Sequence, residues 1–184
     1  LGAENVKKIK LLDKKKLKKK LDINFDKYIF LITINSFIEQ NISIQLFLKN
    51  IFLTLKKFNN TTFIFTMPNS DLKSDFIKNR ILNFCKSNKN AFFFKSMGAQ
   101  NYLSCMKICD VVLGNSSSGI LEAPSLKKST VNIGDRQNGR VQANSVINSG
   151  YSEKKIYDSI KKALSPNFKK QLYKAKNPYF KENT

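Results

Sequence analysis

Short apolar runs alternate with longer amphipathic segments along most of the chain. Tyr28–Thr33 (YIFLIT) is a continuous apolar run, which is typical of a strand covered on both faces of a parallel sheet. Ile42–Phe58 then carries apolar residues at helical spacing, and the same pairing repeats further on. The pattern predicts further strands at Thr62–Thr66, Ala91–Phe94, Val111–Leu113 and Thr130–Ile133, and further helices at Phe76–Asn88, Tyr102–Ile108, Ile120–Leu126, Glu153–Leu164 and Asn167–Tyr173. This alternation predicts an α/β fold with a doubly wound parallel sheet, which is a Rossmann-like architecture.

Polar residues follow each of the five predicted strands. In open parallel sheets, ligands bind in the crevice beyond the carboxyl ends of the strands. The residues that we therefore expect to face one crevice are Asn35 and Ser36, Asn69 and Asp71, Lys95–Gly98, Asn115–Gly119, and Asp135 with Arg136. The turn at Pro68–Asp71 is also expected to supply the N-cap of the helix that follows it.

The segment Asp110–Arg140 carries the strongest chemical signal, because a buried strand runs into a turn rich in small polar residues and then into a helix. The hydroxyls of Ser116 and Ser117, together with the N–H groups of a helix that starts near Gly119, favour binding of a phosphate. Glu122 lies within two turns of these serines, where its carboxylate could accept hydrogen bonds from a nucleotide ribose. Serine-rich caps also occur without a ligand, so the alternative is an ordinary helix N-cap.

The net charge of +20 invites a nucleic-acid interpretation. Most of the excess, however, is lysine scattered over every predicted surface, and the chain has only three arginines, Arg80, Arg136 and Arg140. The chain also lacks an aromatic-plus-basic RNA motif and a zinc finger, so we expect no specific nucleic-acid binding. A coding bias toward Lys, Asn, Ile and Phe would account for the same composition.

Length and motif content limit the remaining classes of protein. A chain of 184 residues forms one ordinary domain, and no apolar run is long enough to span a membrane. Because no signal peptide is recognisable either, we expect a cytoplasmic protein. Three cysteines, Cys85, Cys105 and Cys109, and no histidine make no recognisable metal set. We expect buried free thiols, no metal and no cofactor.

Three stretches, GNSSSGILEAP, VNIGDRQNGR and VQANSVI, closely resemble the UDP-N-acetylglucosamine 2-epimerase family, in its hydrolysing, sialic-acid-pathway type. The resemblance covers nearly the whole chain. It implies that residues 1–184 form a single nucleotide-sugar-binding domain, like the C-terminal half of a glycosyltransferase-B-type fold. It also implies that residues 1–22 are an interdomain linker and that the N-terminal catalytic domain is absent. Completed by such a domain, the protein would convert UDP-GlcNAc to N-acetylmannosamine plus UDP, and the chain alone would be inactive.

The resemblance implies binding roles for residues after the fourth and fifth predicted strands. Ser116 and Ser117 would hold the diphosphate, and Glu122 would bind the ribose hydroxyls. Arg136 would lie near the phosphates or the sugar. Hydroxyls and a guanidinium group are suited to a departing diphosphate, because they stabilise the negative charge that develops on it.

Further roles fall on the loops after the first three predicted strands. The loop at Met97 would meet the uracil ring, and Asn69 would help to position the nucleotide-sugar. After the first strand, where the family usually has a histidine followed by a proline, this chain has Asn35 and Ser36. The resemblance also implies that the family's carboxylate acid/base groups belong to the missing domain, so no catalytic base is assigned in this chain.

Several alternatives stay open at the level of the sequence. The chain could be a non-catalytic nucleotide-sugar-binding remnant or half of a related glycosyltransferase, because fold alone does not fix function. The nucleotide could be UDP or GDP, since recognition of a base through backbone groups leaves little trace in side chains. The helix at Ile42–Leu55 could be part of the core or a face of a homo-oligomer.

Overall fold

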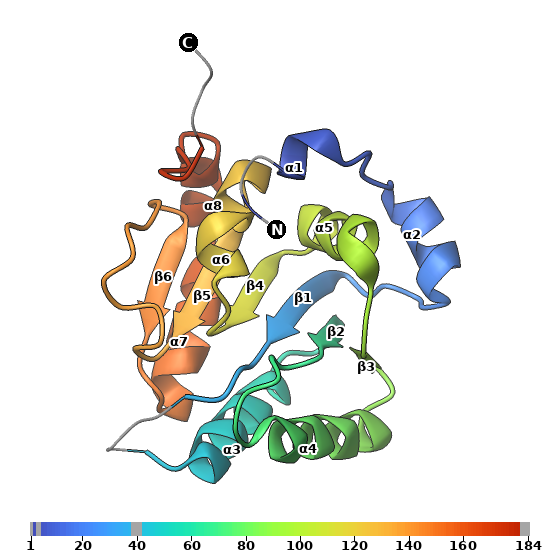
Figure 1. The fold of residues 1–184 in the computed structure, drawn as a ribbon, viewed down its shortest axis with the longest axis vertical. Helices are drawn as coiled ribbons and strands as arrows, with labels where there is room; N and C mark the ends of the chain where they lie inside the picture. The colour runs from blue at the N-terminus through green and yellow to red at the C-terminus, as the bar shows by residue number, and fades with distance from the viewer. Residues whose placement is uncertain (1, 3–4, 38–41, 181–184) are drawn as a thin grey trace.

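The computed structural model describes residues 2, 5–37 and 42–180 (Figure 1). Its strands form one six-stranded, all-parallel sheet in the order β3-β2-β1-β4-β5-β6. The strands are β1 (Tyr28–Thr33), β2 (Thr61–Thr66), β3 (Ala91–Phe94), β4 (Val111–Gly114), β5 (Ser129–Ile133) and β6 (Val146–Ser149). The predicted Rossmann-like α/β fold is confirmed.

Helices cover both faces of this sheet. They are α1 (Asn5–Lys8), α2 (Lys14–Leu21), α3 (Ile44–Leu55), α4 (Ser74–Ser87), α5 (Gly98–Ile108), α6 (Ser118–Leu121), α7 (Glu153–Leu164) and α8 (Pro166–Leu172), with a 3-10 turn η1 (Ala123–Leu126). Alternate residues of β1 belong to different sides of the sheet, as the twofold period of a strand requires. Phe30 and Ile32 pack in the cluster formed with α3, α4, α7 and α8, whereas Ile29 and Leu31 pack in the cluster formed with α1, α2, α5 and η1.

The order of the strands creates a switch point between β1 and β4. The chain runs outward from β1 to β2 and β3, then returns to place β4 on the other side of β1 and continues to β5 and β6. Thr33 pairs with Gly114 at the carboxyl ends of β1 and β4. The loops that leave these two strands therefore diverge at the point where such sheets bind ligands.

Helix α3 forms part of the core. Its Phe47, Leu48 and Ile51 are fully buried, and it packs beside α7 on one face of the sheet. Leu46 and Leu53 lie on its exposed side. The alternative in which this helix contributes to the core therefore holds for most of its apolar residues.

Two elements near the centre and edge of the sheet differ from the prediction. The helix expected at Ile120–Leu126 is divided into the single turn α6 and the 3-10 turn η1, because Pro124 has no N–H to continue the α-helical ladder. The strand β6 was not predicted. It is a four-residue edge strand in which Asn148 and Ser149 interrupt the apolar pattern.

The segment before β1 contributes more structure than its lysine-rich sequence indicates. In α2, Leu17 is fully buried, and the Asp13 side chain caps the helix by accepting a hydrogen bond from the Lys16 N–H at 2.8 Å. The expected cap at Pro68–Asp71 was wrong. Helix α4 begins after Lys73, which has a left-handed backbone and makes no side-chain capping bond.

The described residues contain neither a membrane-spanning helix nor a metal-binding cluster. None of the helices there is long and apolar enough to cross a membrane. Nor do those residues contain three or more His, Cys, Asp or Glu side chains grouped as ligands for a metal ion. Cys85, Cys105 and Cys109 are free thiols, and burial raises the pKa of both Cys105 and Cys109 to about 12. The two more buried thiols are therefore protonated at neutral pH.

Candidate functional site

Two asparagines join the carboxyl ends of β1 and β4. The Asn35 N–H donates to Asn115 Oδ1 at 2.7 Å, and Asn115 Nδ2 donates to the Asn35 carbonyl at 2.9 Å. Both residues are 1% exposed. Asn35 Oδ1 in turn accepts a hydrogen bond from the Asn69 N–H at 2.9 Å, which brings in the loop after β2. Asn35 thus holds three loops together through its backbone and its side chain, while its buried Nδ2 has no hydrogen-bond partner.

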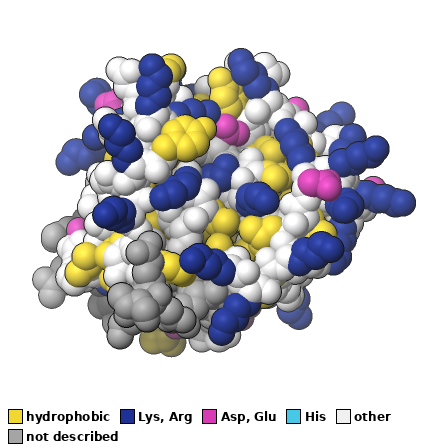
Figure 2. Space-filling model, turned by 90° about the horizontal axis from the view of Figure 1, so that it is seen from above, with side chains coloured by type: hydrophobic (Ala, Val, Ile, Leu, Met, Phe, Trp, Pro, Cys, Tyr) yellow, Lys and Arg dark blue, Asp and Glu magenta, His cyan; other side chains and the backbone are white. Residues whose placement is uncertain are grey.

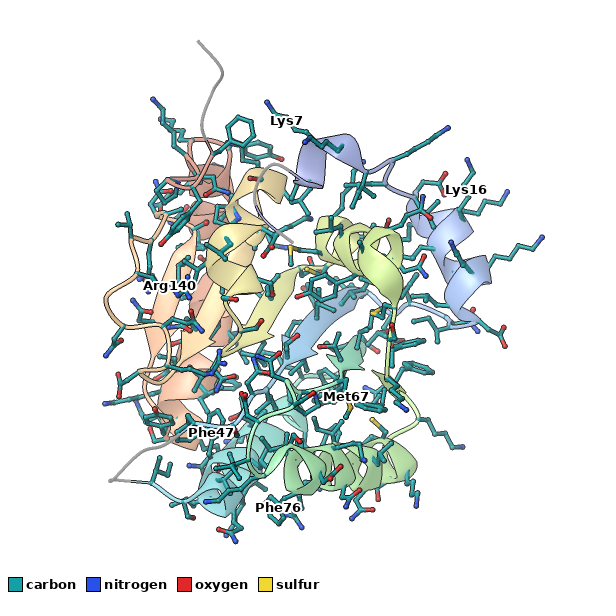
Figure 3. All side chains as sticks on the ribbon, in the orientation of Figure 1. Lys7, Lys16, Phe47, Met67, Phe76 and Arg140 are labelled. Atoms are coloured by element: carbon teal, nitrogen blue, oxygen red, sulfur yellow. The ribbon has the colours of Figure 1, made fainter. Side chains whose placement is uncertain are left out.

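The loop after β5 is tied to the same point. Gln137 Nε2 donates to the Asn115 carbonyl at 2.9 Å, and Arg136 Nη1 donates to the same oxygen at 3.3 Å. Arg136 Nη2 also lies 3.7 Å from Asp71 Oδ2, in the loop after β2. We call Asn35, Asn69, Asn115 and Gln137 the amide network. It confirms that residues after β1, β2, β4 and β5 meet at one edge of the sheet, near the end marked by Met67, which follows β2, and by Phe47 of α3 (Figure 3).

A chain of hydroxyls lies next to the amide network. Ser116 Oγ is 3.1 Å from Ser118 Oγ, which is 2.5 Å from the Tyr102 hydroxyl on α5. Burial raises the pKa of Tyr102 to about 12, so its hydroxyl keeps its proton at neutral pH. Ser117 is the N-cap of α6 but makes no side-chain capping bond. Ser116 Oγ accepts a long hydrogen bond, at 3.4 Å, from the Ser118 N–H at the start of α6. The alternative of an ordinary helix cap therefore holds in part for Ser116, whereas the Ser117 hydroxyl makes no capping bond.

Glycine is required on both sides of the serine turn. Gly114 has φ +130°, and a Cβ there would lie 2.0 Å from the Thr33 carbonyl oxygen. A Cβ on Gly119 would lie 2.6 Å from Thr130 Cγ2. The Gly119 carbonyl also accepts a hydrogen bond from Thr130 Oγ1 at 2.8 Å. Close backbone approach to β1 and β5 thus fixes where the three serines are presented.

Glu122 lies directly after α6 and is 2% exposed. Its Oε2 is buried and has no hydrogen-bond partner. Burial raises the pKa of this carboxyl group to about 7, because the charged form loses its hydration. A buried carboxylate oxygen without a partner is costly, and a hydroxyl donor from a ligand would relieve that cost.

The helix that follows the serines is shorter than expected. Because α6 is a single turn, its dipole is smaller than that of the helix predicted through Leu126. An anion at this turn would depend mainly on the side-chain hydroxyls and on Arg136. The structure thus retains the predicted polar groups but reduces the predicted contribution of the helix.

Met97 lies apart from the amide network. It is the N-cap of α5, it is partly buried against the cluster formed by α2 and α5, and Gly98 after it has φ +66°. Tyr102, one turn further along α5, is the residue through which this helix reaches the serines. Sequence reasoning missed Tyr102 and also Gln137. Gln137 could have been found as a polar neighbour of Arg136, whereas the direction of Tyr102 depends on the packing of α5.

The sheet order, the switch-point crevice and the polar loops define a Rossmann-like domain of the kind found in glycosyltransferase-B-type proteins. The chain is similar to the crystal structure of UDP-GlcNAc 2-epimerase from Neisseria meningitidis bound to UDP-GlcNAc, with a TM-score of 0.67 and 20% identity over 90% of this chain and 44% of that chain. It is also similar to WaaG, a glycosyltransferase involved in lipopolysaccharide biosynthesis, with a TM-score of 0.54 and 13% identity over 87% of this chain and 44% of that chain.

The family model for UDP-N-acetylglucosamine 2-epimerase matches residues 2–184, so the chain belongs to that family. It is 36% identical to GDP/UDP-N,N'-diacetylbacillosamine 2-epimerase (hydrolyzing) of Campylobacter jejuni, over 92% of this chain and 44% of the relative. It is 35% identical to polysialic acid biosynthesis protein P7 of Escherichia coli, over 100% of this chain and 46% of the relative. The chain therefore spans about half the length of the curated relatives that it matches.

Proposed function

We propose that this chain is the nucleotide-binding half of a hydrolysing UDP-N-acetylglucosamine 2-epimerase, which converts UDP-GlcNAc to N-acetylmannosamine plus UDP when an N-terminal domain completes it. The observation that carries the proposal is the unpartnered, buried Oε2 of Glu122 beside the turn of Ser116, Ser117 and Ser118. A nucleoside diphosphate supplies both complementary parts. Its ribose hydroxyls can donate to the carboxylate, and its phosphate oxygens can accept from the serines.

Each binding residue has a distinct part in this proposal. Ser116 and Ser117 bind the diphosphate, with Arg136 at the phosphates or the sugar. Met97 and the backbone around it bind the base, and Asn69 helps to position the nucleotide-sugar. The relatives support a nucleotide-sugar ligand, because a Neisseria meningitidis structure with this fold holds UDP-GlcNAc.

The chemistry assigns this half to leaving-group stabilisation. Removal of the proton at C2 of the sugar and departure of UDP from C1 give an unsaturated sugar, and addition of water then yields the free product. Negative charge develops on the departing diphosphate, where hydroxyl and guanidinium donors stabilise it. Asn35 cannot accept the C2 proton, because an amide has no basic site near neutral pH. A base from the completing domain is therefore part of the proposal, and the chain alone is expected to be inactive.

Calorimetric titration with UDP and GDP tests the binding half of the proposal. At moderate salt, we expect saturable binding of one nucleotide at one site, weakened about tenfold by Ser116→Ala. Ser87→Ala is the matched control, because Ser87 is exposed at the end of α4 and far along the chain from the serine turn. Equal binding of every polyanion, or equal effects of the two substitutions, would overturn the proposed site.

A non-catalytic nucleotide-sugar-binding protein is the second candidate function. It is favoured by Asn35, because this position holds an amide side chain and not an ionisable one. The Asn35 side chain accepts a hydrogen bond from the Asn69 N–H. A chimera that carries the N-terminal half of the Campylobacter jejuni relative distinguishes the two candidates. Release of UDP from UDP-GlcNAc by the chimera supports the epimerase half. UDP binding without turnover, unchanged by Asn35→His, supports the binding protein.

A further inference from the structure

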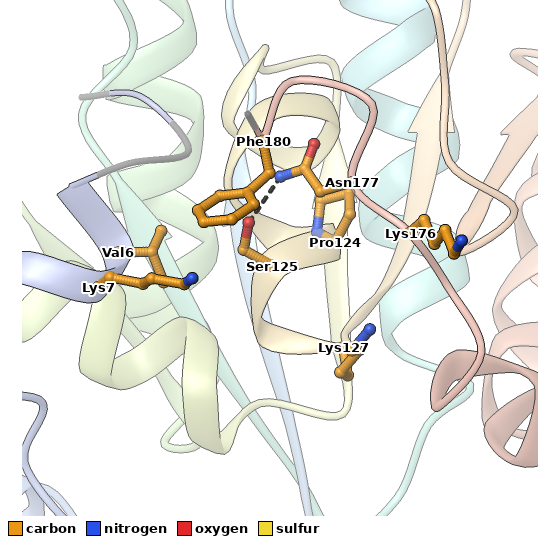
Figure 4. A pocket seen from close by; sticks show the side chains of 8 residues that line it. All are labelled: Val6, Lys7, Pro124, Ser125, Lys127, Lys176, Asn177 and Phe180. Atoms are coloured by element: carbon orange, nitrogen blue, oxygen red, sulfur yellow. Dashed lines mark hydrogen bonds between the residues drawn. The ribbon is translucent and has the colours of Figure 1, made fainter. Parts of the chain in front are cut away.

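A pocket lies at the end of the molecule opposite the amide network, where α1, η1 and the chain after α8 come together (Figure 1 and Figure 4). It encloses about 460 Å³, which is within the range of small-molecule sites. Its lining residues are Val6, Lys7, Pro124, Ser125, Lys127, Lys176, Asn177 and Phe180. None of the amide network or of the serine turn is among them. The pocket is therefore separate from the nucleotide crevice in both residues and location.

The charged side chains among the described lining residues are all basic. Lys7, Lys127 and Lys176 supply three ammonium groups from three different segments, and no acidic side chain is among the described residues that line the pocket. Figure 2 looks onto this end of the molecule, where Lys and Arg side chains far outnumber acidic ones. Lysine charges of one sign around a concave surface raise the local concentration of anions. The pocket therefore favours a ligand that carries negative charge.

The polar side of the pocket is held in place by defined hydrogen bonds. Asn177 Nδ2 donates to the Leu121 carbonyl at 2.8 Å and to Ser125 Oγ at 2.6 Å. Because Asn177 supplies the hydrogen in the second bond, the Ser125 hydroxyl keeps its own hydrogen for another acceptor. Lys127 Nζ donates to the Ala175 carbonyl, which leaves two of its three hydrogens for a ligand. Donors from Ser125 and Lys127 are thus positioned before a ligand arrives.

The apolar side of the pocket is formed by Val6, Pro124 and Phe180. Lys7 Nζ lies 4.0 Å from the centroid of the Phe180 ring, so the cation and the ring are held against one another. A ligand with a ring could pack on these apolar groups while its anionic group reaches the lysines. Inorganic anions would make only the second set of contacts.

We infer that this pocket binds a small phosphomonoester that carries an apolar or planar ring. Phosphate is favoured over carboxylate because the lining residues include three lysines and no arginine. Lysine acts as a point charge that suits the several oxygens of a phosphate, whereas planar carboxylates are matched best by the arginine fork. The serine hydroxyl donor adds a further contact for a phosphate oxygen. The ring occupies the side formed by Pro124 and Phe180.

Phenyl phosphate is the probe that tests this inference. The full chain is titrated with phenyl phosphate at about 0.15 M salt, which is close to physiological ionic strength. Binding is followed by amide chemical shifts. We expect saturable one-to-one binding, with shifts at Ser125 and Asn177, and weaker binding of both inorganic phosphate and benzoate. Excess UDP should leave phenyl phosphate bound, because the two sites are separate. Displacement by UDP would overturn the inference, since the probe would then occupy the nucleotide crevice.

Three variants test which side chains contribute to the binding of phenyl phosphate. Lys176→Gln should weaken phenyl phosphate about fivefold, whereas Lys161→Gln on the exposed side of α7 should leave it unchanged. Phe180→Leu should reduce the preference for phenyl phosphate over inorganic phosphate without weakening inorganic phosphate. Equal weakening by the two lysine variants, or an unchanged preference in Phe180→Leu, would show general attraction to a basic surface and overturn the inference. Circular dichroism of each variant confirms that it is folded.

Discussion

Arg136 Nη2 lies 3.7 Å from Asp71 Oδ2, so a side chain after β5 reaches one after β2 across the ends of β1 and β4. The same guanidinium group donates to the Asn115 carbonyl. Arg136 is thus already paired with an acid at the site where we propose that it meets a phosphate. Asp71 and a diphosphate would compete for one cation, and this competition can be measured.

The Asp71→Asn substitution should tighten UDP binding by about two- to threefold, because it removes the acid that competes for Arg136. The effect is small because the pair is partly exposed and screened by salt. Calorimetry at low and moderate salt measures it. Asp75→Asn is the control, since Asp75 is exposed on α4 and pairs with Lys78. Weaker binding in Asp71→Asn would mean that Asp71 positions Arg136 for the ligand instead of competing with it.

Asn115→Ala should lower the free energy of unfolding by about 3 kcal/mol, because it leaves a buried N–H and a buried carbonyl of Asn35 without partners. Urea denaturation followed by circular dichroism gives the value. Asn83→Ala, on the exposed side of α4, should change stability by no more than about 0.5 kcal/mol. Similar losses in the two variants would show that the amide network contributes little to folding.

The contribution of Glu122 to the free energy of unfolding should fall as pH rises from about 4.5 toward about 7. Its pKa is raised from 4.5 in the unfolded reference to about 7 in the folded chain. Between these values the folded state binds a proton that the unfolded state has lost, so deprotonation favours unfolding. The contribution is fully present below the lower value and lost above the higher one. It amounts to at most about 3 kcal/mol.

Glu122→Gln provides the comparison, since it removes the titrating group and keeps the shape of the side chain. The difference in unfolding free energy between the original chain and this variant should change across that pH range. Denaturant titrations at pH 4.5, 6 and 7.5 measure it. A difference that is constant with pH would mean that Glu122 does not titrate in this window.

Binding of UDP near pH 7 should release a fraction of a proton from Glu122. Hydrogen bonds from ribose hydroxyls to the carboxylate favour its charged form and therefore lower its pKa toward the ordinary range. Calorimetry in two buffers with different ionisation enthalpies measures the protons released. Glu122→Gln should abolish the part that comes from the protein, leaving only that of the nucleotide. Equal proton release in both chains would place the ribose elsewhere.

Much of the fold could be predicted because the central strands are continuous apolar runs. Tyr28–Thr33 and Ala91–Phe94 are strands with the predicted bounds, and Glu153–Leu164 is a helix with the predicted bounds. The edge strand β6 was missed because a strand at the edge needs no continuous apolar sequence, and part of it is polar. The break at Pro124 was visible in the sequence, but the apolar spacing of Ile120–Leu126 outweighed it in the prediction.

The position of the candidate site followed from a topological rule, whereas its contacts did not. Polar residues after parallel strands must meet at one edge, so Asn35, Asn115 and Arg136 could be grouped from the sequence. Which atoms pair depends on side-chain directions that a linear pattern does not contain. Tyr102 illustrates this limit, because it comes from a helix and reaches Ser118 only through the way α5 packs on the sheet.

The amide network has a consequence for how the charge of the crevice depends on pH. Asparagine and glutamine side chains do not ionise near neutral pH, and the whole chain contains no histidine. The framework that joins Asn35 to Asn115 therefore keeps one electrical state from mildly acidic to mildly alkaline solution. Glu122 differs from these amides, because burial raises its pKa to about 7 and its charge therefore changes near neutral pH. A ligand that changes the pKa of Glu122 would therefore change the charge of the crevice without altering the charge of the side chains that join its loops.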